Sequence, residues 1–345
     1  MLKKMASRIQ LSSPEEYTIS WIAALAHERA AATAMLDERH DRPLNFTQHE
    51  HDTNSYTWGR IGHHNIVIAS LPAGRYGLTI ATTTANSLRF SLPHIRLGLM
   101  VGIGAGIPQI QYGHDIRLGD VVVSLPEGTS GGVVQYDLVK ARAGGHILTG
   151  HLAPPPESLL NALSTLQAAH ELEDSEMSSL LKEMLERFPK MADRTAKSFG
   201  YTHQGFEHDR LFTTSSRDID TDHQASREVM RDQRVSTNPE IHYGVIASGN
   251  TLVKNARERQ EILQRLPEDI RNKCFCIEME AAGLMNTFPC MVVRGICDYA
   301  DENKNDLWQK YAAATAAAFA KEFLSFVDTE KVKKEPAICE VLRES

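Results

Sequence analysis

The segment RLGLMVGIGAGI, residues 96–107, indicates the fold class of this chain. It begins as an almost continuous apolar run, which is typical of a strand buried on both faces, and it ends in Gly102, Gly104 and Gly106. Strands of this kind alternate with helical patterns elsewhere in the chain. Such alternation predicts a layered α/β fold with a parallel or mixed sheet.

The pattern is regular on both sides of this strand. Before it we expect a strand at 17–25, an Ala-rich helix at 26–37, a hairpin of strands 56–60 and 65–71 around Gly62, and a helix at 78–92. After it we expect strands at 119–125, 132–138, 241–248, 274–279 and 291–297, and helices at 157–170, 175–188, 258–266, 281–287 and 307–327. Ligands of α/β sheets bind beyond the carboxyl ends of the strands, so a site is sought in the residues that follow each apolar run.

The length of 345 residues suits one large α/β domain with insertions or two small domains. We expect one domain at 17–328, with a flexible leader at 1–16 and a charged tail at 329–345. A polar insertion at about 152–239 interrupts this domain. Its irregular part is longer than an ordinary loop of roughly 12–15 residues, so it is either a functional cap or a surface excursion.

Composition excludes several classes of protein. With 37 basic and 44 acidic side chains the net charge is −7, which argues against a dedicated nucleic-acid binder, because such proteins carry a basic surface. No window approaches the roughly 18–20 apolar residues of a membrane span, and the start lacks the apolar core of a secretory signal. Five cysteines without framework spacing predict reduced, buried thiols in a cytoplasmic protein, with a mature secreted form as the alternative.

Acidic residues follow three of the predicted strands. Glu28 comes after the first strand, Glu278 and Glu280 end the run CFCIEME, and Asp298 follows RGIC. Each alone has an ordinary explanation, as a surface glutamate, a solvated strand end or a helix N-cap. Together they can converge on one pocket and suit cleavage of a glycosidic bond. In that reaction one acid protonates the leaving group, one activates the attacking group and one holds sugar hydroxyls.

The glycines of the opening segment do not form the dinucleotide fingerprint G-x-G-x-x-G, because Ile107 stands at its last position. They form either a plain tight turn or a place where the backbone approaches a flat or anionic ligand closely. We expect no cofactor.

Six segments carry a resemblance: IAALAHE (22–28), VGIGAGI (101–107), RLGDVVVS (117–124), HYGVIASGNTLVKN (242–255), EMEAAGLMNTFP (278–289) and RGICDYAD (294–301). They resemble the purine/uridine phosphorylase superfamily, and within it the 5′-methylthioadenosine/S-adenosylhomocysteine nucleosidases and the fungal nucleoside-phosphorylase-like domains. The last two segments are specific as a pair, whereas the glycine turn alone is weak. The resemblance spans about residues 17–327 and implies a three-layer α/β/α sandwich with a central mixed sheet.

The resemblance implies roles for individual residues. Glu280 matches the acid that accepts hydrogen bonds from the ribose 2′- and 3′-hydroxyls, and Asp298 matches the general acid that protonates purine N7. Glu28 matches the glutamate that activates water in the nucleosidases. The other expected substrate-binding residues are Met279, Glu278, Gly104, Ala105, Ser248, Asn250, Leu252 and Val253.

The attacking group is water or phosphate. The phosphorylase branch holds phosphate with an Arg and a Ser, and Met100 and Ile103 stand at those positions here. Neither side chain can donate a hydrogen bond to an anion, which favours hydrolysis. Arg75, which follows a predicted strand, is a candidate to hold phosphate or the 5′-phosphate of a nucleotide. Cys297 replaces a Ser of the bacterial enzymes before Asp298, so a supporting hydrogen bond is expected to be weaker.

We therefore predict a purine nucleosidase, active in purine nucleoside metabolism or salvage, that releases free base and ribose or ribose phosphate. A phosphate-using purine nucleoside phosphorylase is the first alternative. A non-catalytic nucleoside-sensing module of the fungal receptor type is the second.

The expected partner is a small purine nucleoside or nucleotide, with no nucleic acid and no membrane. Two pairs of histidines, His49 with His51 and His63 with His64, lie in polar loops without the spacing of a zinc site, so we predict no metal. The resemblance also implies a homo-oligomer, a dimer or a larger assembly.

Overall fold

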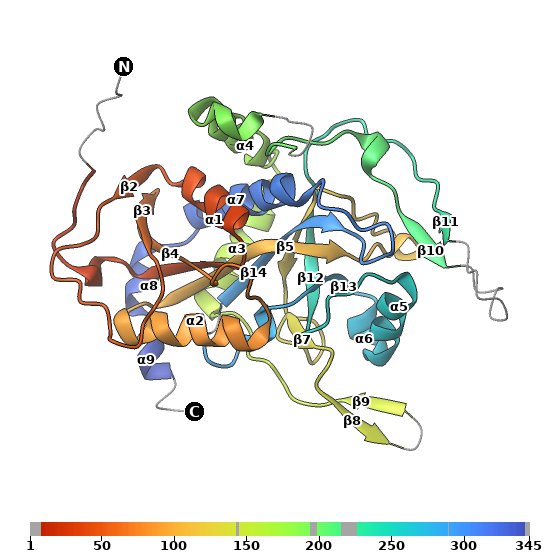
Figure 1. Ribbon diagram of the computed structural model, residues 1–345, viewed down its shortest axis with the longest axis horizontal. Helices are drawn as coiled ribbons and strands as arrows, with labels where there is room; N and C mark the ends of the chain where they lie inside the picture. Colours follow the sequence, from red (N-terminus) through yellow and green to blue (C-terminus); the bar gives the residue numbers. More distant parts are fainter. Residues whose placement is uncertain (1–7, 143–144, 194–198, 215–225, 289, 342–345) are drawn as a thin grey trace.

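The computed structural model describes residues 8–142, 145–193, 199–214, 226–288 and 290–341, and a ten-stranded mixed sheet forms their centre (Figure 1). Its strands are β1 (Ile19–Ala23), β2 (Glu38–His40), β3 (Thr57–Ile61), β4 (His64–Ser70), β5 (Leu97–Gly106), β6 (Val121–Ser124), β7 (Val133–Gln135), β12 (Ile241–Ser248), β13 (Cys274–Glu278) and β14 (Cys290–Asp298). The predicted layered α/β fold is confirmed.

The strand β5 organises the sheet. It pairs in parallel with β1 and β14, and its end pairs antiparallel with β13, where Ile277 lies opposite Ala105. The strand order runs from β13 through β12, β6 and β14 back to β5, so these five strands close into a ring. This antiparallel pairing, which the sequence did not indicate, brings the end of β13 to the ends of β5 and β14.

Helices cover both faces of the sheet (Figure 1). The helices α1 (Ala26–Met35) and α7 (Gln309–Ser325) pack together over one face, and α2 (Leu78–Ser91) lies on the other. Small residues let α7 approach closely, since a Cβ atom at Gly295 of β14 would overlap the backbone of Ala312. The three-layer arrangement is therefore confirmed.

The insertion at 152–239 is anchored on α7 through one buried carboxylate. The helices α3 (Glu157–His170) and α4 (Met177–Arg187) meet at Glu322 of α7. One oxygen of Glu322 lies 2.9 Å from Nε2 of His170 and accepts the backbone N–H of Glu176 at 2.8 Å, and the other accepts the Ser175 hydroxyl at 2.6 Å. Because a buried carboxylate is costly without such partners, these bonds fix the helices on the body.

Two small hairpins lie apart from the main sheet (Figure 1). They are β8 (Val139–Arg142) with β9 (Gly145–Leu148), and β10 (Phe212–Thr214) with β11 (Ser226–Glu228). Neither was predicted, because strands this short carry too little alternation to be recognised. The short helix α6 (Glu268–Arg271), which follows α5 (Ala256–Arg265), was missed for the same reason.

The helix predicted at 281–287 is wrong, because the structure has only a 3-10 turn at Ala281–Gly283. The Thr82 hydroxyl of α2 donates a 2.5 Å hydrogen bond to the carbonyl of Gly283. A Cβ atom at Gly283 would also collide with the carbonyl oxygen of Leu78. Contact with α2 therefore replaces the regular helix.

Both ends of the domain are more ordered than predicted. The helices α8 (Thr329–Lys334) and α9 (Ile338–Val341) belong to the expected charged tail, yet they bury Val332 and Ile338. Residues 8–16 of the expected flexible leader also make specific contacts, with Ile9 forming a bridge to His40 and Ser13 capping a 3-10 turn. Residues 1–7 and 342–345 of these two segments lie outside the described residues.

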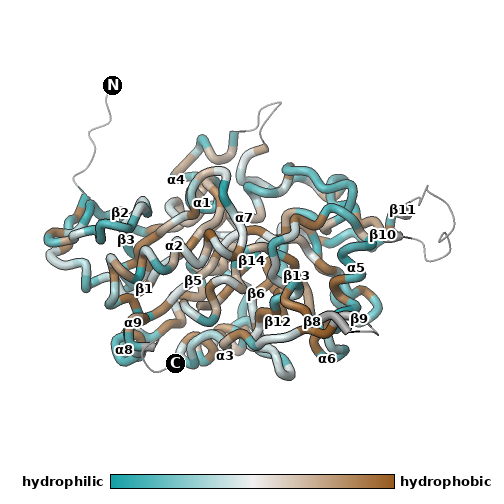
Figure 2. Tube along the Cα trace, turned by 60° about the horizontal axis from the view of Figure 1, so that its bottom comes forward, coloured by the Kyte–Doolittle hydropathy of each residue, from teal (hydrophilic) through white to brown (hydrophobic). Residues whose placement is uncertain are grey.

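Hydrophobic residues gather along the central strands, for example β12 and β13 (Figure 2). This distribution is that of a buried sheet between amphipathic covering layers. Within the described ranges, none of the helices combines the length and the apolar character needed to cross a membrane.

Candidate active site

A cavity of about 250 Å³ lies where the ends of β1, β5, β13 and β14 meet. Its lining includes three of the acids predicted from strand ends, Glu28, Glu280 and Asp298. All three are buried, with 3%, 6% and 4% of their surface exposed. Buried carboxylates cost free energy unless they are hydrogen-bonded or paired, so the partners of each one determine its chemistry.

Glu28, in the first turn of α1, is held by the backbone. One oxygen accepts the N–H groups of Ala24 at 2.6 Å and Leu25 at 2.8 Å, and the other accepts the N–H of Ile103 at 2.8 Å. A carboxylate has about four lone-pair sites, and three of them are used here. The remaining site, on the oxygen bonded to Ile103, can accept a hydrogen bond from a water molecule in the cavity.

Glu278 and Glu280 share one buried cation, the Arg294 guanidinium of β14. The Arg294 Nη2 atom forms ion pairs with Glu278 and, at 3.5 Å, with Glu280. Glu278 also accepts the backbone N–H groups of Glu280 and Ala281, each at 3.0 Å. Its oxygens thus accept hydrogen bonds from Arg294 and from the turn that carries Glu280, and Glu278 also lines the cavity.

Glycines make room for these charged groups. A Cβ atom at Gly102 would lie 2.5 Å from both the Arg294 guanidinium and the Glu28 carboxylate, and one at Gly104 would overlap the sulfur of Cys276. Two of the three glycines that end β5, Gly102 and Gly104, are therefore required by the packing beneath the cavity. Gly104 and Ala105 also line the cavity, as predicted.

Glu280 carries the most unusual electrostatics of the site. Burial, followed by the negative charges of Glu278 and Glu28, raises the pKa of Glu280 to about 7, although the Arg294 guanidinium lowers it. The backbone N–H of Gly77 donates to Glu280 at 3.3 Å. A carboxylate with this pKa changes its charge near neutral pH, and its ionised form is a strong acceptor for hydroxyl groups.

Asp298 is bonded only to donors in the described residues. One oxygen lies 2.9 Å from the ammonium nitrogen of Lys304 and 3.0 Å from the sulfur of Cys297. The other accepts the backbone N–H of Ala300 at 2.8 Å. Burial alone would lower the pKa of Lys304, but the negative charge of Asp298 raises it overall. The two groups therefore form an ion pair.

The structure separates the remaining predicted site residues into two groups. Met279, Leu252 and Val253 line the cavity, whereas Ser248, Asn250 and Arg75 do not. The Ser248 hydroxyl accepts the backbone N–H of Ala282, and the side-chain amide oxygen of Asn250 accepts that of Leu78, so both stabilise neighbouring turns. Arg75 is exposed to solvent, and its neighbour Tyr76 lines the cavity instead.

Solved structures that share this architecture include 5′-methylthioadenosine/S-adenosylhomocysteine nucleosidases and a futalosine hydrolase. A 5′-methylthioadenosine/S-adenosylhomocysteine nucleosidase from Neisseria meningitidis, in complex with methylthio-immucillin-A, is 18% identical over 89% of this chain and 97% of its own, with a TM-score of 0.54. A putative nucleosidase of the same kind from Borrelia burgdorferi, bound to adenine, has a TM-score of 0.56 at 15% identity, covering 90% of this chain and all of its own. Futalosine hydrolase of Helicobacter pylori has a TM-score of 0.52 at 19% identity, covering 91% and 99%.

The chain has the nucleoside phosphorylase-like fold. No family model matches its sequence. A nucleotide-binding leucine-rich repeat (NLR)-like protein of the fungus Hyaloscypha variabilis is 43% identical over 321 residues, which cover 93% of this chain. The chain spans about 30% of the length of that relative.

Two residues of this nucleoside phosphorylase-like site were not assigned from the sequence. Arg294 had a signal, because it interrupts the apolar run CMVV before GIC, and a buried arginine requires carboxylate partners. Lys304 had none, because it lies in a polar loop and reaches Asp298 only through the turn of that loop.

Among the described residues of the insertion, 152–193, 199–214 and 226–239, none lines the cavity. Two arginines of the insertion, Arg231 and Arg234, are nearly buried in ion pairs with aspartates. Arg231 pairs with Asp209 at 3.0 Å and donates to the hydroxyl of Tyr299, the residue after Asp298, at 3.0 Å. The insertion thus supports the site from outside.

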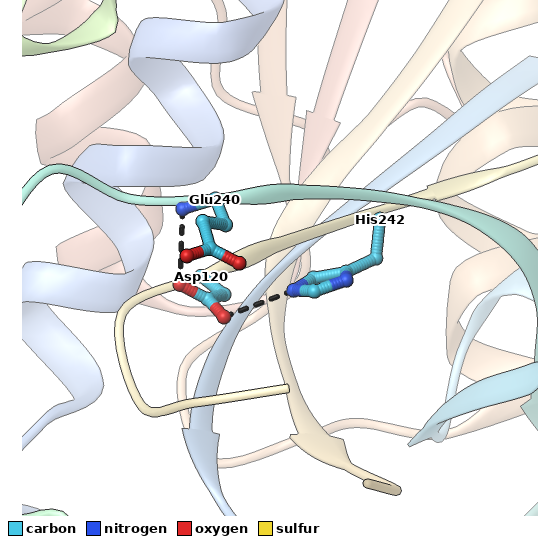
Figure 3. Close-up of side chains that lie close together, drawn as sticks. All are labelled: Asp120, Glu240 and His242. Carbon is cyan, nitrogen blue, oxygen red and sulfur yellow. Dashed lines mark hydrogen bonds and ion pairs between the residues drawn. The ribbon is translucent and has the colours of Figure 1, made fainter. Parts of the chain in front are cut away.

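Asp120, Glu240 and His242 lie close enough together to hold a metal ion (Figure 3). Both oxygens of Asp120 are bound by the Arg234 guanidinium, at 2.6 and 2.8 Å, and one of them lies 2.9 Å from the His242 ring. Burial raises the pKa of Asp120, but the hydrogen bonds from His242 and Arg234 outweigh it and lower the pKa overall. Arg234 therefore already supplies the positive charge that a metal ion would bring.

Proposed function

We propose that this chain is a purine nucleosidase. It would hydrolyse the N-glycosidic bond of a purine nucleoside or nucleotide and release free base and ribose or ribose phosphate. The observation that carries the proposal is the convergence of Glu28, Glu280 and Asp298 on one cavity at the ends of β1, β13 and β14. The nucleosidases that share the fold support the same reaction class.

Each acid has a distinct task in this mechanism. Glu280 accepts hydrogen bonds from the ribose hydroxyls, and Met279 packs beneath the sugar and base. Asp298 lies at the purine N7, where a proton makes the base a better leaving group. Glu28 orients water through its free lone pair and takes its proton as the C1′–N9 bond breaks through an oxocarbenium-like state.

Water is favoured over phosphate by the surroundings of Glu28. The side chain of Ile103 faces the cavity and cannot bind an anion, and its backbone N–H is already bonded to Glu28. Met100, the other position that would hold phosphate, is fully buried in β5. An oxyanion next to the Glu28 carboxylate would also face like-charge repulsion.

The test is a product assay. Purified protein is incubated with adenosine, inosine, AMP and ATP, each with and without phosphate, and free base, ribose and ribose 1-phosphate are separated by chromatography. We expect base and ribose, or ribose phosphate, without added phosphate, and a loss of about 10²–10⁴-fold in kcat for Glu28→Gln. Ribose 1-phosphate formed only with phosphate would instead establish a phosphorylase.

The alternative is a nucleoside-sensing module of a receptor, which the comparison with the NLR-like relative does not favour over the nucleosidase. Such a module binds its nucleoside in the same cavity without cleaving it. Equilibrium binding of adenosine or inosine by the wild type, with no product after long incubation, would select this reading over the nucleosidase.

A further inference from the structure

The surroundings of Asp298 set a problem for its role as the acid. A protonated carboxyl group needs an acceptor for its O–H, but the two nitrogen partners of Asp298, the Lys304 ammonium and the backbone N–H of Ala300, can only donate, and the third partner, the Cys297 sulfur, is a weak acceptor. This geometry is that of an ionised carboxylate. An ionised Asp298 has no proton to give to the leaving purine.

We propose that Lys304 is the source of the proton that Asp298 passes to N7 of the leaving purine. This inference rests on the proposed nucleosidase function. The Lys304 ammonium lies 2.9 Å from the Asp298 carboxylate, and both side chains line the cavity. Lys304 acts through Asp298, so it is a positioning and proton-supplying residue rather than a group that touches the substrate.

The proposed step balances in atoms and charge. As the C1′–N9 bond breaks, its electron pair moves onto the purine, N7 takes a proton from Asp298, and Asp298 takes one from Lys304. Lys304 becomes a neutral amine and Asp298 remains a carboxylate. Water adds its hydroxide to C1′ and gives its proton to Glu28. After product release, exchange with solvent removes the proton from Glu28 and restores one to Lys304.

The other nearby groups are poorer proton sources. The Cys297 thiol is buried, and this burial, with the charge of Asp298, raises its pKa well above the usual range. Asp306 also lines the cavity, but its contribution is a negative charge that raises the pKa of Lys304 and so favours the ammonium form of that residue. Arg259, which feels the charge of Asp298, cannot lose a proton at physiological pH. Lys304 is therefore the cationic acid in direct contact with Asp298.

The test compares a nucleoside that needs protonation with one that does not. The substrates are inosine and 7-methylinosine, whose methylated N7 already carries the positive charge, and the variants are Lys304→Met and Lys304→Arg. We expect Lys304→Met to lower kcat for inosine at least 10²-fold and to change kcat for 7-methylinosine less than threefold. Lys304→Arg keeps the charge but holds its proton too tightly, so it should not restore inosine cleavage.

Each other outcome overturns the proposal. If Asp298 carried its own proton, removing the nearby cation would leave kcat for inosine unchanged or higher, and Lys304→Arg would resemble the wild type. If Lys304 only shaped the loop, both substrates would lose activity equally. Lys310→Met, on a lysine of α7 that does not line the cavity, is the matched control, and thermal melting verifies the fold. A wild type that cleaves none of adenosine, inosine, AMP and ATP in the product assay would refute the nucleosidase itself and the proposal with it.

Discussion

Two clusters of buried acids in this molecule differ in the balance of their charges. At the cavity, four buried carboxylates, Glu28, Glu278, Glu280 and Asp298, have only two cations in ion pairs with them among the described residues, Arg294 and Lys304. Where the insertion meets the rest of the domain, three aspartates face three arginines and a histidine. The members of the second cluster are Asp115, Asp120, Asp209, Arg117, Arg231, Arg234 and His242.

The pKa values follow this balance. Excess negative charge and burial raise the pKa of Glu280 in the cavity, whereas paired cations lower the pKa of Asp120 despite its burial. A buried acid with a matching cation stabilises one structure, and a buried acid without one is costly unless a ligand or a proton relieves it. The comparison therefore separates the acids of a site from the acids of the scaffold.

The sharpest test of this difference is one substitution made in both clusters. Asp298→Asn removes a carboxylate from the cavity, where it is needed at N7, so we expect kcat for inosine to fall about 10³-fold, within the range for general acid catalysis. The melting temperature should fall less than in Asp120→Asn, because only one cation, Lys304, loses its partner and it keeps the nearby negative charge of Asp306. Steady-state kinetics and thermal melting measure the two effects. Near-normal turnover in this variant would remove Asp298 from the mechanism.

Asp120→Asn should show the reverse pattern. It leaves Arg234 and His242 buried beside a neutral amide, and breaking a buried ion pair costs about 3–5 kcal/mol. We expect the denaturant midpoint to fall accordingly, with kcat of the remaining folded protein unchanged. The exposed pair Arg210 and Glu228 provides the control, since Glu228→Gln should leave the midpoint where it is. A fully stable Asp120→Asn would show that the charge balance of this cluster does not matter.

The positions of the acids were predictable because each follows an apolar strand. Glu28, Glu280 and Asp298 were assigned from strand ends and from resemblance, and the structure brings all three to one cavity. Sequence periodicity also gave the main helices and the central strands of the sheet. These features depend on the spacing of apolar residues within one segment, which can be read directly from the sequence.

The partners of the acids were not predictable to the same degree. Glu278 was expected to bind substrate, but its oxygens are taken by Arg294 and the following turn, which depends on the antiparallel pairing of β13 with β5. Arg75 was expected near an anion because it follows a strand, but it is exposed to solvent and does not line the cavity, whereas its neighbour Tyr76 does. Long-range pairing and loop geometry decide these contacts.

A smaller effect is expected from Glu280→Gln. Hydrogen bonds to a charged acceptor contribute about 1.5–3 kcal/mol, so losing them to the ribose hydroxyls should raise KM roughly 10–100-fold. The fold should become slightly more stable, since one uncompensated carboxylate is gone. The matched control is Glu322→Gln, where three donors of the insertion surround an equally buried carboxylate. That variant should lose stability and keep its KM. A stability loss in Glu280→Gln as large as that in Glu322→Gln would contradict the distinction between the clusters.

The finest test is the pH dependence of KM. Since the pKa of Glu280 is about 7 in the unliganded protein, its carboxylate is mostly protonated below that pH and mostly ionised above it. Ribose hydroxyls bind the ionised form, so KM should rise about tenfold for each pH unit below 7 and level off above it. The folding contribution has the opposite sign, because a raised pKa favours the folded state at low pH and this gain is lost as pH rises from about 4.5 through 7. Nucleoside should therefore raise the melting temperature more at pH 8 than at pH 6. In Glu280→Gln both profiles should be flat over this range, and a pH-dependent KM that survives the substitution would assign the titration to another group.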